Sequence, residues 1–524
     1  MSDSINNNQR EELHRTIWAI ANDLRGAVDG WDFKQYVLGM LFYRYISENL
    51  RNFINKNEHA FGNTSFDYAK ISDELAETQR QEMLKSKGFF ILPSELFTTM
   101  RDKAPHDPDL NITMGAVFRN IEGSTKGTAS EENFKGLFDD LDVNSQRLGS
   151  SVKERNERLV NLLNKIGDLP LGSVHDNHID AFGDAYEYLM GMYASAAGKS
   201  GGEFFTPQDV SELIAKLTLV GKESVNKVYD PACGSGGLLL KFAKILGADN
   251  VRAGFFGQEI NLTINRLCRI NMFLHDIDYS DFHIAHGDTL LEPYYESYEP
   301  FEAIVSNPPY STKWIGADSP VLINDPRFAP AGVLAPKSKA DMAFVMHCLS
   351  WLATNGTAAI VSFPGILYRG GAEKKIRQYL IDNNYVDCII QLPDNLFFGT
   401  SIATCIMVLK KSKSENKTLF IDASQQFVKI TNNNKLTEKH INKIVDAYTK
   451  REEIDHFLTV VGNSEIEKQD YNLSVSTYVE EKDTRKLIDI VQLNANIKEI
   501  VEKVDYLRNA IDEIIKEIEG DDNE

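Results

Sequence analysis

The chain has 524 residues, which is too many for one ordinary hydrophobic core, so two or three domains are expected. It carries 56 lysine and arginine residues against 76 aspartate and glutamate residues, a formal charge of −20. This balance argues against a protein that binds nucleic acid through a broad basic face. Any DNA contact needs a local basic patch or a partner that supplies positive charge.

The sequence also indicates the cellular compartment in which the protein is expected. It contains no uncharged apolar stretch of about 18 residues or more, so no transmembrane helix is predicted. Its start, MSDSINNNQREEL, lacks a basic-then-apolar signal segment. The cysteines form no CxxC pair, which favours buried free thiols in a reducing compartment over disulfides or structural zinc. We therefore expect a cytoplasmic protein. The five cysteines are Cys233, Cys268, Cys348, Cys388 and Cys405.

Residues 1 to about 165 are predicted to be mostly helical. Leu13, Ile17, Ile20 and Leu24 follow one another at helical spacing and share one face. A turn at Gly30 precedes a second helical segment rich in aromatic residues, FKQYVLGMLFYRYISENL. This pattern is typical of a helical bundle core. Periodicity alone does not tell whether the domain also docks a partner or DNA.

From about residue 170 to 410, short β-branched runs alternate with helical stretches. That alternation predicts a doubly wound α/β sheet. A weaker run, KTLFIDAS, and the polar stretch ITNNNKLTEKHINK follow. The predicted strands lie in NKVYDPACG, VRAGFFGQEI, FEAIVSNPP, TAAIVSFPG, VDCIIQLP and TCIMVLKK.

A glycine-rich turn follows the first of these strands, in VYDPACGSGG at residues 228–237. Gly234, Gly236 and Gly237 let the backbone bend sharply and approach a ligand closely. Strand, turn and helix in this order place the turn at the carboxyl edge of the sheet, where doubly wound folds bind nucleotides. The alternative is a tight turn that only packs a helix on a strand.

Three carboxylates strengthen the binding interpretation. Glu259 ends the next strand, where a carboxylate can accept hydrogen bonds from both ribose hydroxyls. Asp288, in HGDTL, is suited to an adenine amino group, and Asp230 stands just before the turn. Such a negative wall suits adenosine with an ammonium or sulfonium charge better than a pyrophosphate. It favours S-adenosylmethionine over NAD.

Two further motifs lie near residue 200. Gly198-Lys199-Ser200 ends like a P-loop, but Tyr193 stands where its first glycine belongs and a helical pattern precedes it, so ATP hydrolysis is not expected. In GGEFFTPQDV, Thr206 is predicted to cap a helix with Pro207 at its first position. The exposed amides of that helix start could receive the cofactor's carboxylate.

A metal site is not predicted. His275, His283 and His286 lie among acidic residues in a loop-like stretch without ligand spacing, and ordinary surface histidines are expected there.

The strand FEAIV ends in NPPY, residues 307–310. Two prolines fix the turn and remove backbone donors. The Asn307 amide oxygen and the Pro308 carbonyl can accept the two hydrogens of a planar amino group and draw its nitrogen toward tetrahedral geometry. Tyr310 offers a stacking surface for the base. The alternative is a proline-stiffened turn without a chemical role.

The last stretch has apolar residues at strict three-four spacing. Two apolar residues per heptad form the narrow seam of a coiled coil, and such a seam needs a partner helix. That helix could come from another subunit or from this chain's own N-terminal domain. The seam consists of Ile490, Leu493, Ile497, Ile500, Val504, Leu507, Ile511, Ile514 and Ile518.

The order FFTP, DPACGSGG, NPPY resembles the amino-group DNA methyltransferases of the γ arrangement. Nearly the whole chain resembles the modification (M, HsdM) subunit of type I restriction–modification systems, which serve host defence. The resemblance implies a class I S-adenosylmethionine-dependent, Rossmann-like α/β sheet of seven strands with one antiparallel hairpin. Around it we expect an N-terminal helical domain at 1–165, a catalytic domain at 166–475 and a C-terminal coiled-coil helix at 476–524.

The same resemblance implies roles for individual residues. Asn307, Pro308, Pro309 and Tyr310 would form the target-adenine motif. Cys233 departs from the small residues such as alanine that are usual in such loops. The cofactor would be lined by Glu203, Phe204, Phe205, Thr206, Pro207, Gln208, Asp230, Pro231, Cys233, Gly234, Ser235, Gly236, Gly237, Glu259 and Asp288.

The resemblance also implies partners. Two modification subunits would surround one specificity subunit that selects the site in double-stranded DNA, where an adenine is flipped out, and a restriction subunit would complete the nuclease. Delegated sequence reading would account for the charge of −20, and the specificity subunit's long helices are a candidate partner of the seam. Phosphate contacts could come from Lys313, Lys337, Lys339, Arg369, Lys374, Lys375 and Arg377, although a solvated charged face explains each of them equally well.

Two rival functions remain open. The same motif serves cytosine N4 and the glutamine side-chain amide, and the chain could instead be a non-catalytic scaffold that binds S-adenosylmethionine. The residues alone do not separate adenine from cytosine. They also do not give the DNA sequence recognised, the methylation state preferred or the phosphate-contacting residues.

Overall fold

The computed structural model describes residues 11, 13–18, 32–171, 181–197, 205–398, 400–430, 433–480 and 490–520. The chain divides into two compact units, residues 1–479 and 480–524, and each is described by itself. None of the helices in these described ranges combines the length and apolar character needed to cross a bilayer.

The N-terminal part is helical, as predicted, and is organised around one long helix, α2 (Asp32–Ala60). Met40, Leu41 and Phe42 on this helix are fully buried. Of the predicted first helix, Leu13 and Ile17 are buried, whereas Ile20, Leu24 and Gly30 lie outside the described residues. The other helices of this part are α3 (Asp73–Glu77), α4 (Arg80–Lys87), α5 (Phe97–Lys103), α6 (Leu110–Ser124), α7 (Glu131–Phe134) and α8 (Val152–Gly167).

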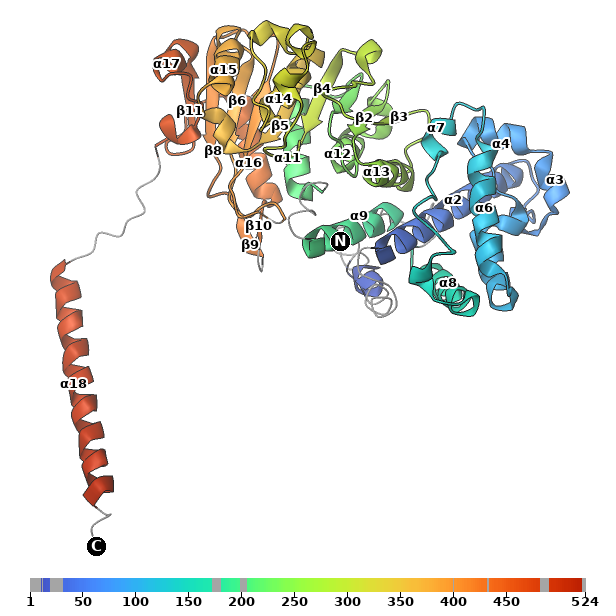
Figure 1. Ribbon diagram of the computed structural model, residues 1–524, viewed down its shortest axis with the longest axis horizontal. Coiled ribbons are helices and arrows are strands. Elements are labelled where there is room, and N and C mark those ends of the chain that lie inside the picture. Colours follow the sequence, from blue (N-terminus) through green and yellow to red (C-terminus); the bar gives the residue numbers. More distant parts are fainter. Residues whose placement is uncertain are drawn as a thin grey trace. The chain divides into compact units, whose positions relative to one another are not determined.

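The part of the chain after these helices is built on a nine-stranded sheet (Figure 1), with the strand order β11-β8-β6-β7-β5-β4-β1-β2-β3. β7 is antiparallel to β5 and β6, and β11 is antiparallel to β8; the other neighbours are parallel. The expected seven strands with one antiparallel member are therefore present, extended by β8 and β11. The strands are β1 (Val228–Asp230), β2 (Phe255–Glu259), β3 (Phe282–His286), β4 (Phe301–Ser306), β5 (Leu352–Ser362), β6 (Val386–Gln391), β7 (Cys405–Leu409), β8 (Lys417–Asp422) and β11 (Leu458–Gly462).

Helices cover both faces of the sheet. Alternate side chains of each strand point to opposite faces: Ala303 and Val305 of β4 join one buried cluster, and Phe301 and Ile304 join the other. The first face is covered by α11 (Gln208–Leu219), α12 (Gly237–Leu246), α13 (Leu262–Leu274) and α16 (Glu438–Lys450). The second is covered by α14 (Asp341–Trp351), α15 (Ala372–Asp382) and α17 (Asn463–Lys468).

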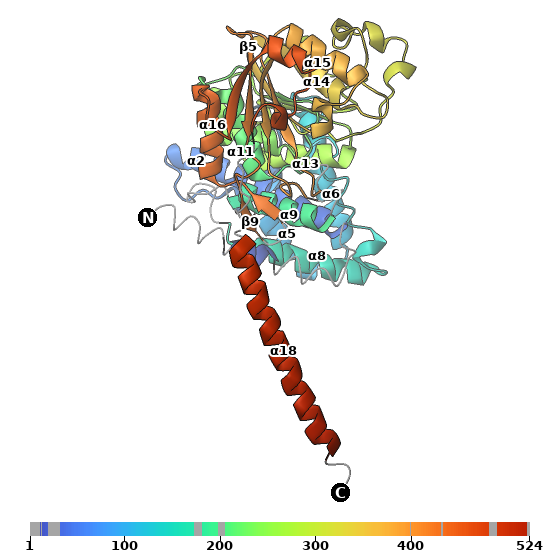
Figure 2. The ribbon, with the colours of Figure 1, turned by 90° about the vertical axis from the view of Figure 1, so that its left-hand side faces the viewer.

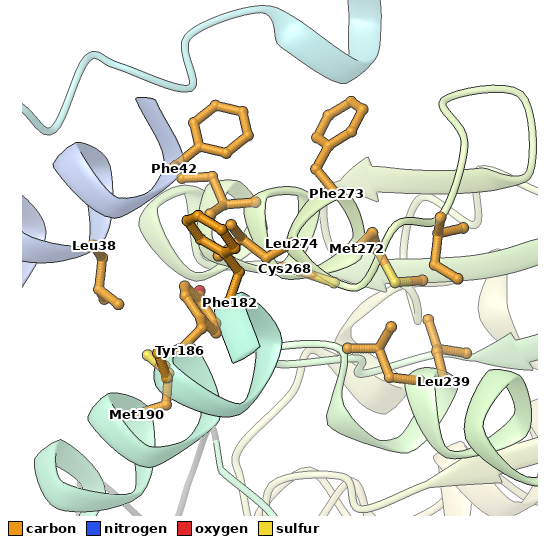
Figure 3. Packing of buried hydrophobic residues seen from close by; sticks show 14 of the residues in the cluster. Leu38, Phe42, Phe182, Tyr186, Met190, Leu239, Cys268, Met272, Phe273 and Leu274 are labelled. Carbon is orange, nitrogen blue, oxygen red and sulfur yellow. The ribbon is translucent and has the colours of Figure 1, made fainter. Parts of the chain in front are cut away.

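One continuous apolar cluster links the N-terminal helices to the sheet. Helix α9 (Ala181–Ala197) presents Phe182 and Tyr186 toward Phe42 of α2 and toward α13 (Figure 3). The Tyr186 hydroxyl donates to the Leu267 carbonyl of α13 at 2.7 Å, and the rings of Phe42 and Phe273 lie 5.9 Å apart. Helices α2 and α9 therefore pack against α13, next to the edge of the sheet that contains β2 and β3.

The second unit is one helix, α18 (Ile490–Gly520), as the apolar spacing predicts. It is drawn as a single straight helix in Figures 1 and 2. Its predicted seam is solvent-exposed along its whole length, from 43 % at Leu493 to 69 % at Ile490.

Two sequence predictions about local structure are wrong. The stretch with His283 and His286, predicted to be loop-like, forms edge strand β3, and its polar residues hid the strand signal. Helix α11 begins at Gln208 after Pro207, and no side chain caps it, so Thr206 is not its cap. All five cysteines are free and buried, as predicted.

Candidate active site

The glycine turn between β1 and α12 is held by its own backbone. The Gly236 amide donates to the Cys233 carbonyl at 2.8 Å, and the Cys233 amide donates to the Gln258 carbonyl of β2 at 3.1 Å. Gly236 has φ of 84°, and a Cβ there would lie 2.8 Å from the Cys268 sulfur. Only glycine fits this position, because a side chain would meet both the strained conformation and the thiol.

Asp230 places a buried carboxylate beside this turn. Its side chain is fully buried, and Oδ1 accepts a hydrogen bond from the Ala232 amide at 3.0 Å. Oδ2 and the neighbouring Ser306 hydroxyl have no hydrogen bond of standard geometry with any described residue. Ser306 nevertheless lies close enough to lower the pKa of Asp230, which favours the ionised form of the carboxylate. Burial raises the pKa of Asp230 to about 7, so ionisation is costly until a cation approaches.

Glu259 closes the other side of the turn at the end of β2. Its Oε2 accepts from the Gly234 amide at 3.1 Å, and its Oε1 accepts from the Asn261 amide at 2.8 Å. Burial raises the pKa of Glu259, and these backbone donors oppose that rise. Both carboxylate oxygens are thereby fixed in direction.

A cavity of about 420 Å³ opens next to the turn. Glu259 and Asp288 both line it, and Asp288 Oδ1 accepts from the Leu290 amide at 2.9 Å. The cavity continues past Asn307 and Pro309 to the ring of Trp314. The two carboxylates, Asn307 and Pro309 therefore line the same cavity.

The NPPY residues lie beside the glycine turn because β4 pairs with β1, in the register Val228 to Ala303. The Asn307 Nδ2 donates to Thr206 Oγ1 at 3.1 Å, and the Tyr310 hydroxyl donates to Asn307 Oδ1 at 2.5 Å. These two hydrogen bonds fix the orientation of the Asn307 amide, with Nδ2 toward Thr206 and Oδ1 toward Tyr310. They leave Oδ1 one further lone pair, because a carbonyl oxygen accepts two hydrogen bonds.

Asn307 also contributes to the lining of two cavities. It lines the 420 Å³ cavity, and it lines the narrow cradle formed by Asp230, Cys233, Gly234 and Thr206. Thr206 therefore belongs to the site by a route the sequence did not indicate: it orients the amide instead of capping α11. A single threonine before a proline gave no signal of that contact.

Tyr310 is half-buried, and its ring meets the edge of Phe397 at 6.3 Å between centroids. Burial raises the pKa of Tyr310 well above its usual value, so the phenol remains a hydrogen-bond donor at neutral pH. Its role as a stacking surface for a base stays a prediction.

Three aromatic residues near the site were missed by sequence reasoning. Phe397 and Phe398 follow β6 in the loop LPDNLFFG, and Phe398 lies 6.0 Å from Phe205. Trp314 lines the cavity and donates its indole N–H to the Pro336 carbonyl at 3.1 Å. For Phe397 and Phe398, the available signal was an aromatic pair in the loop that follows a parallel strand, at the edge where the other site residues lie.

The remaining predicted cofactor residues fall into three groups. Glu203 and Phe204 lie outside the described residues. Gln208, at the start of α11, has a buried side-chain oxygen without a hydrogen-bond partner among the described residues. Pro207, Pro231, Ser235 and Gly237 surround the turn or the start of α11, and Phe205 packs against Phe398.

The predicted phosphate contacts are only partly available. Arg377 is buried and donates to the carbonyls of Tyr471 and Ile366 at 2.8 Å, so it is structural and that prediction is wrong. Lys337, Arg369 and Lys374 form ion pairs with Asp318, Glu373 and Asp470 respectively. Lys313 is exposed at the cavity.

The histidines are not all surface residues. The His275 side chain is buried and approaches Glu187 at 3.5 Å, and burial lowers the pKa of His283, which packs on Phe256. The prediction of ordinary surface histidines is therefore wrong for these two. No group of three or more candidate metal ligands occurs in the described parts of the chain.

Comparison with known proteins identifies the family of the chain. The family described as N-6 DNA Methylase matches residues 177–487, and the family described as HsdM N-terminal domain matches residues 13–166. The MpnII type I restriction enzyme methylase subunit of Mycoplasma pneumoniae is 47 % identical over 530 residues, covering 98 % of this chain and 97 % of that protein. The MjaVII methylase subunit of Methanocaldococcus jannaschii is 36 % identical over 65 % of this chain and 59 % of that protein.

A solved structure extends the agreement to three dimensions. The methyltransferase subunit of a type I restriction–modification system from Streptococcus thermophilus superposes with a TM-score of 0.80 at 34 % identity, covering 90 % of this chain and all of that chain. This match supports the assignment of the fold as an α/β methyltransferase sheet with a helical N-terminal part. The chain therefore belongs to the N-6 DNA methylase family, as a methylase subunit of the type I restriction enzyme kind.

Proposed function

We propose that this chain transfers a methyl group from S-adenosylmethionine to N6 of an adenine that is flipped out of double-stranded DNA. The observation that carries the proposal is the place of Asn307, which is oriented by two hydrogen bonds and borders both the glycine-turn cradle and the larger cavity. The acceptor and the reacting methyl group would meet at this border.

The residues present fit the cofactor. A sulfonium or ammonium charge near the turn would offset the buried charge of Asp230, whose Oδ2 has no hydrogen-bond partner among the described residues. Glu259 would accept the ribose hydroxyls and Asp288 the adenine amino group. When bound, S-adenosylmethionine would supply a methyl group activated by its positive sulfur.

The chain's own residues would prepare the acceptor nitrogen. The free lone pair of Asn307 Oδ1 and the Pro308 carbonyl would accept the two amino hydrogens, which draws the nitrogen out of conjugation with the ring. Thr206 and the Tyr310 hydroxyl keep the amide from rotating during this step. Tyr310, with Phe397 behind it, would offer an aromatic surface to the extruded base.

The proposal extends to assembly. We infer that the chain works in the cytoplasm with a specificity subunit, a second copy of itself and a restriction subunit. Residues 1–165, 166–475 and 476–524 would be the docking, catalytic and coiled-coil parts. The exposed seam of α18 supports a helical partner, and the specificity subunit is the candidate that fits the charge of −20.

The test is to purify the chain with the specificity subunit encoded beside it, supply S-adenosylmethionine with a labelled methyl group, and map the modified bases. We expect label on adenine N6 at one recurring sequence, and none without the specificity subunit. Label on cytosine N4 or on protein glutamine would replace the proposed substrate, and cofactor binding without transfer would indicate an assembly role.

A further inference from the structure

A short segment after β8 differs in charge from the rest of the chain. Between Asp422 and Glu438 there is no acidic residue, although the whole chain carries a charge of −20. The segment contains Lys429 and Lys435, and its other polar residues are side-chain amides and hydroxyls. Lysines contact phosphates, and amides can bond to base edges, so this composition is typical of a nucleic-acid contact.

The segment folds into a two-stranded ribbon that is not part of the main sheet. β9 (Val428–Ile430) pairs antiparallel with β10 (Asn433–Lys435), and the ribbon projects from one end of the sheet (Figure 1). Every residue of β9 is exposed, with Val428 at 40 % and Ile430 at 48 %. Lys429 forms no ion pair with any described residue. The side chains on both faces of β9 are therefore accessible to another molecule.

The inner strand is fixed to the active site. The Asn434 amide donates to the Asn395 carbonyl at 2.9 Å, and Asn434 Nδ2 donates to Asp394 Oδ1 at 2.9 Å. Asp394 and Asn395 begin the loop that carries Phe397 and Phe398.

A second tie runs to α11. The Leu436 amide, directly after β10, donates to Asp209 Oδ2 at 2.6 Å, and Asp209 stands three residues after Thr206. The two strands therefore differ in their surroundings. The inner strand, β10, is anchored beside the residues that hold Asn307, whereas the outer strand, β9, faces solvent.

We propose that the β9–β10 ribbon enters a groove of the DNA duplex beside the flipped base. This inference rests on the proposed function. The major groove is about 12 Å wide and admits a two-stranded ribbon. Lys429 would contact a phosphate, the β-branched side chains would contact base methyl groups or sugars, and the anchoring of β10 would set the ribbon's distance from Asn307.

The experiment uses the complex of this chain with its specificity subunit. Lys429→Glu should raise the KM for DNA several-fold while leaving kcat and cofactor affinity unchanged. The affinity for DNA falls as salt increases. Lys429→Ala should make the slope of log affinity against log salt less steep by about 0.9, the value for one phosphate contact. The matched control is Lys417→Glu, at the exposed amino end of β8 and therefore at the opposite edge of the sheet, which should change neither quantity.

A photo-crosslinking residue at Val428 separates the two possible occupants. We expect crosslinks to duplex DNA that depend on the specificity subunit. Crosslinks only to a protein subunit, or an unchanged KM and salt slope in the Lys429 variants, would overturn the proposal. Crosslinking needs no methyl transfer, so a wild-type complex that crosslinks DNA but fails to methylate would contradict the proposed function and leave the ribbon's role intact.

Discussion

The carboxyl edge of the sheet and helix α18 are both incomplete in this chain, but in opposite chemical senses. At the edge, the buried Asp230 Oδ2 and Ser306 hydroxyl lie close together, but neither has a hydrogen bond of standard geometry with a described residue. Along α18, apolar side chains such as Ile500 (61 %) and Leu507 (51 %) are exposed to solvent.

Each kind of incompleteness indicates what should complete it. A buried polar group without a partner costs about 1–3 kcal/mol, and a polar or charged ligand recovers that cost. An exposed apolar seam gains free energy only when another apolar surface covers it. We therefore expect a small polar or cationic ligand at the edge and a protein partner along the helix.

The largest effect is expected at Asn307. Asn307→Ala should reduce methyl transfer by about 10²–10³-fold, the usual loss when one preorganised hydrogen-bonding group is removed from a reacting centre. Cofactor affinity should stay nearly unchanged, as measured by calorimetry. Thr206→Val is the companion variant: it removes only the hydroxyl that orients the amide and should cost less. Methylation that persists in Asn307→Ala would end the assigned role.

The seam offers the next test. Ile500→Glu combined with Leu507→Glu should weaken association with the specificity subunit at least about a hundredfold, because each buried aliphatic side chain contributes about 1.5–3 kcal/mol. The control is Val501→Glu combined with Tyr506→Glu, which alters exposed residues off the seam. Equal losses in both pairs, measured by co-purification and by equilibrium titration, would contradict a specific seam. Methyl transfer by the catalytic unit should fall only as far as assembly falls.

The pH dependence of cofactor binding should come from Asp230. Its pKa of about 7 in the empty protein means that binding of a cation requires loss of a proton below that pH. Affinity should rise about tenfold per unit as pH increases toward 7 and then level off, with proton release measurable by calorimetry in two buffers. Asp230→Asn should bind more weakly and lose this dependence. Affinity that is constant from pH 6 to 8 would argue against a cation at Asp230.

The same group should affect stability without cofactor. The folded-state pKa of about 7 lies above the unfolded value near 4, so its contribution is fully present below pH 4 and is lost as pH rises through 7. The loss is at most about 4 kcal/mol. Thermal unfolding from pH 5 to 8 should show a smaller decline in Asp230→Asn than in the native chain. Parallel declines in both proteins would mean that another group controls this range.

The smallest effect concerns the turn itself. Gly236→Ala should lower the free energy of unfolding by about 1–3 kcal/mol, from positive φ combined with the close Cys268 sulfur. Gly221→Ala is a matched control, since Gly221 also has positive φ (77°) but no atom within 4 Å of an added Cβ. The difference between the two, measured by chemical denaturation, isolates the packing contribution. A loss at Gly221 as large as the loss at Gly236 would show that the thiol contact is relieved at little cost.

The parts of the fold that the sequence predicted are those with strong local signals. Strands such as β4 and β6 are largely apolar because both faces of the sheet are covered. β3 was missed because an edge strand tolerates polar residues such as His283 and His286.

The site shows the same division. Asp230, Glu259 and Asn307 stand at strand ends, where chain order alone predicts a shared edge. The contact of Thr206 with Asn307 and the burial of Arg377 depend on residues distant in sequence, so no local pattern could reveal them. The ribbon of β9 and β10 was visible only as a polar stretch, because its tie to Asn395 exists only in the folded chain.

The most direct measurement is a structure of the chain with S-adenosylmethionine bound. The account predicts the ribose on Glu259, the cationic end beside Asp230 and the methyl group in reach of an amino nitrogen held at Asn307. A cofactor seated elsewhere, or an Asn307 amide turned into packing and away from it, would contradict the account.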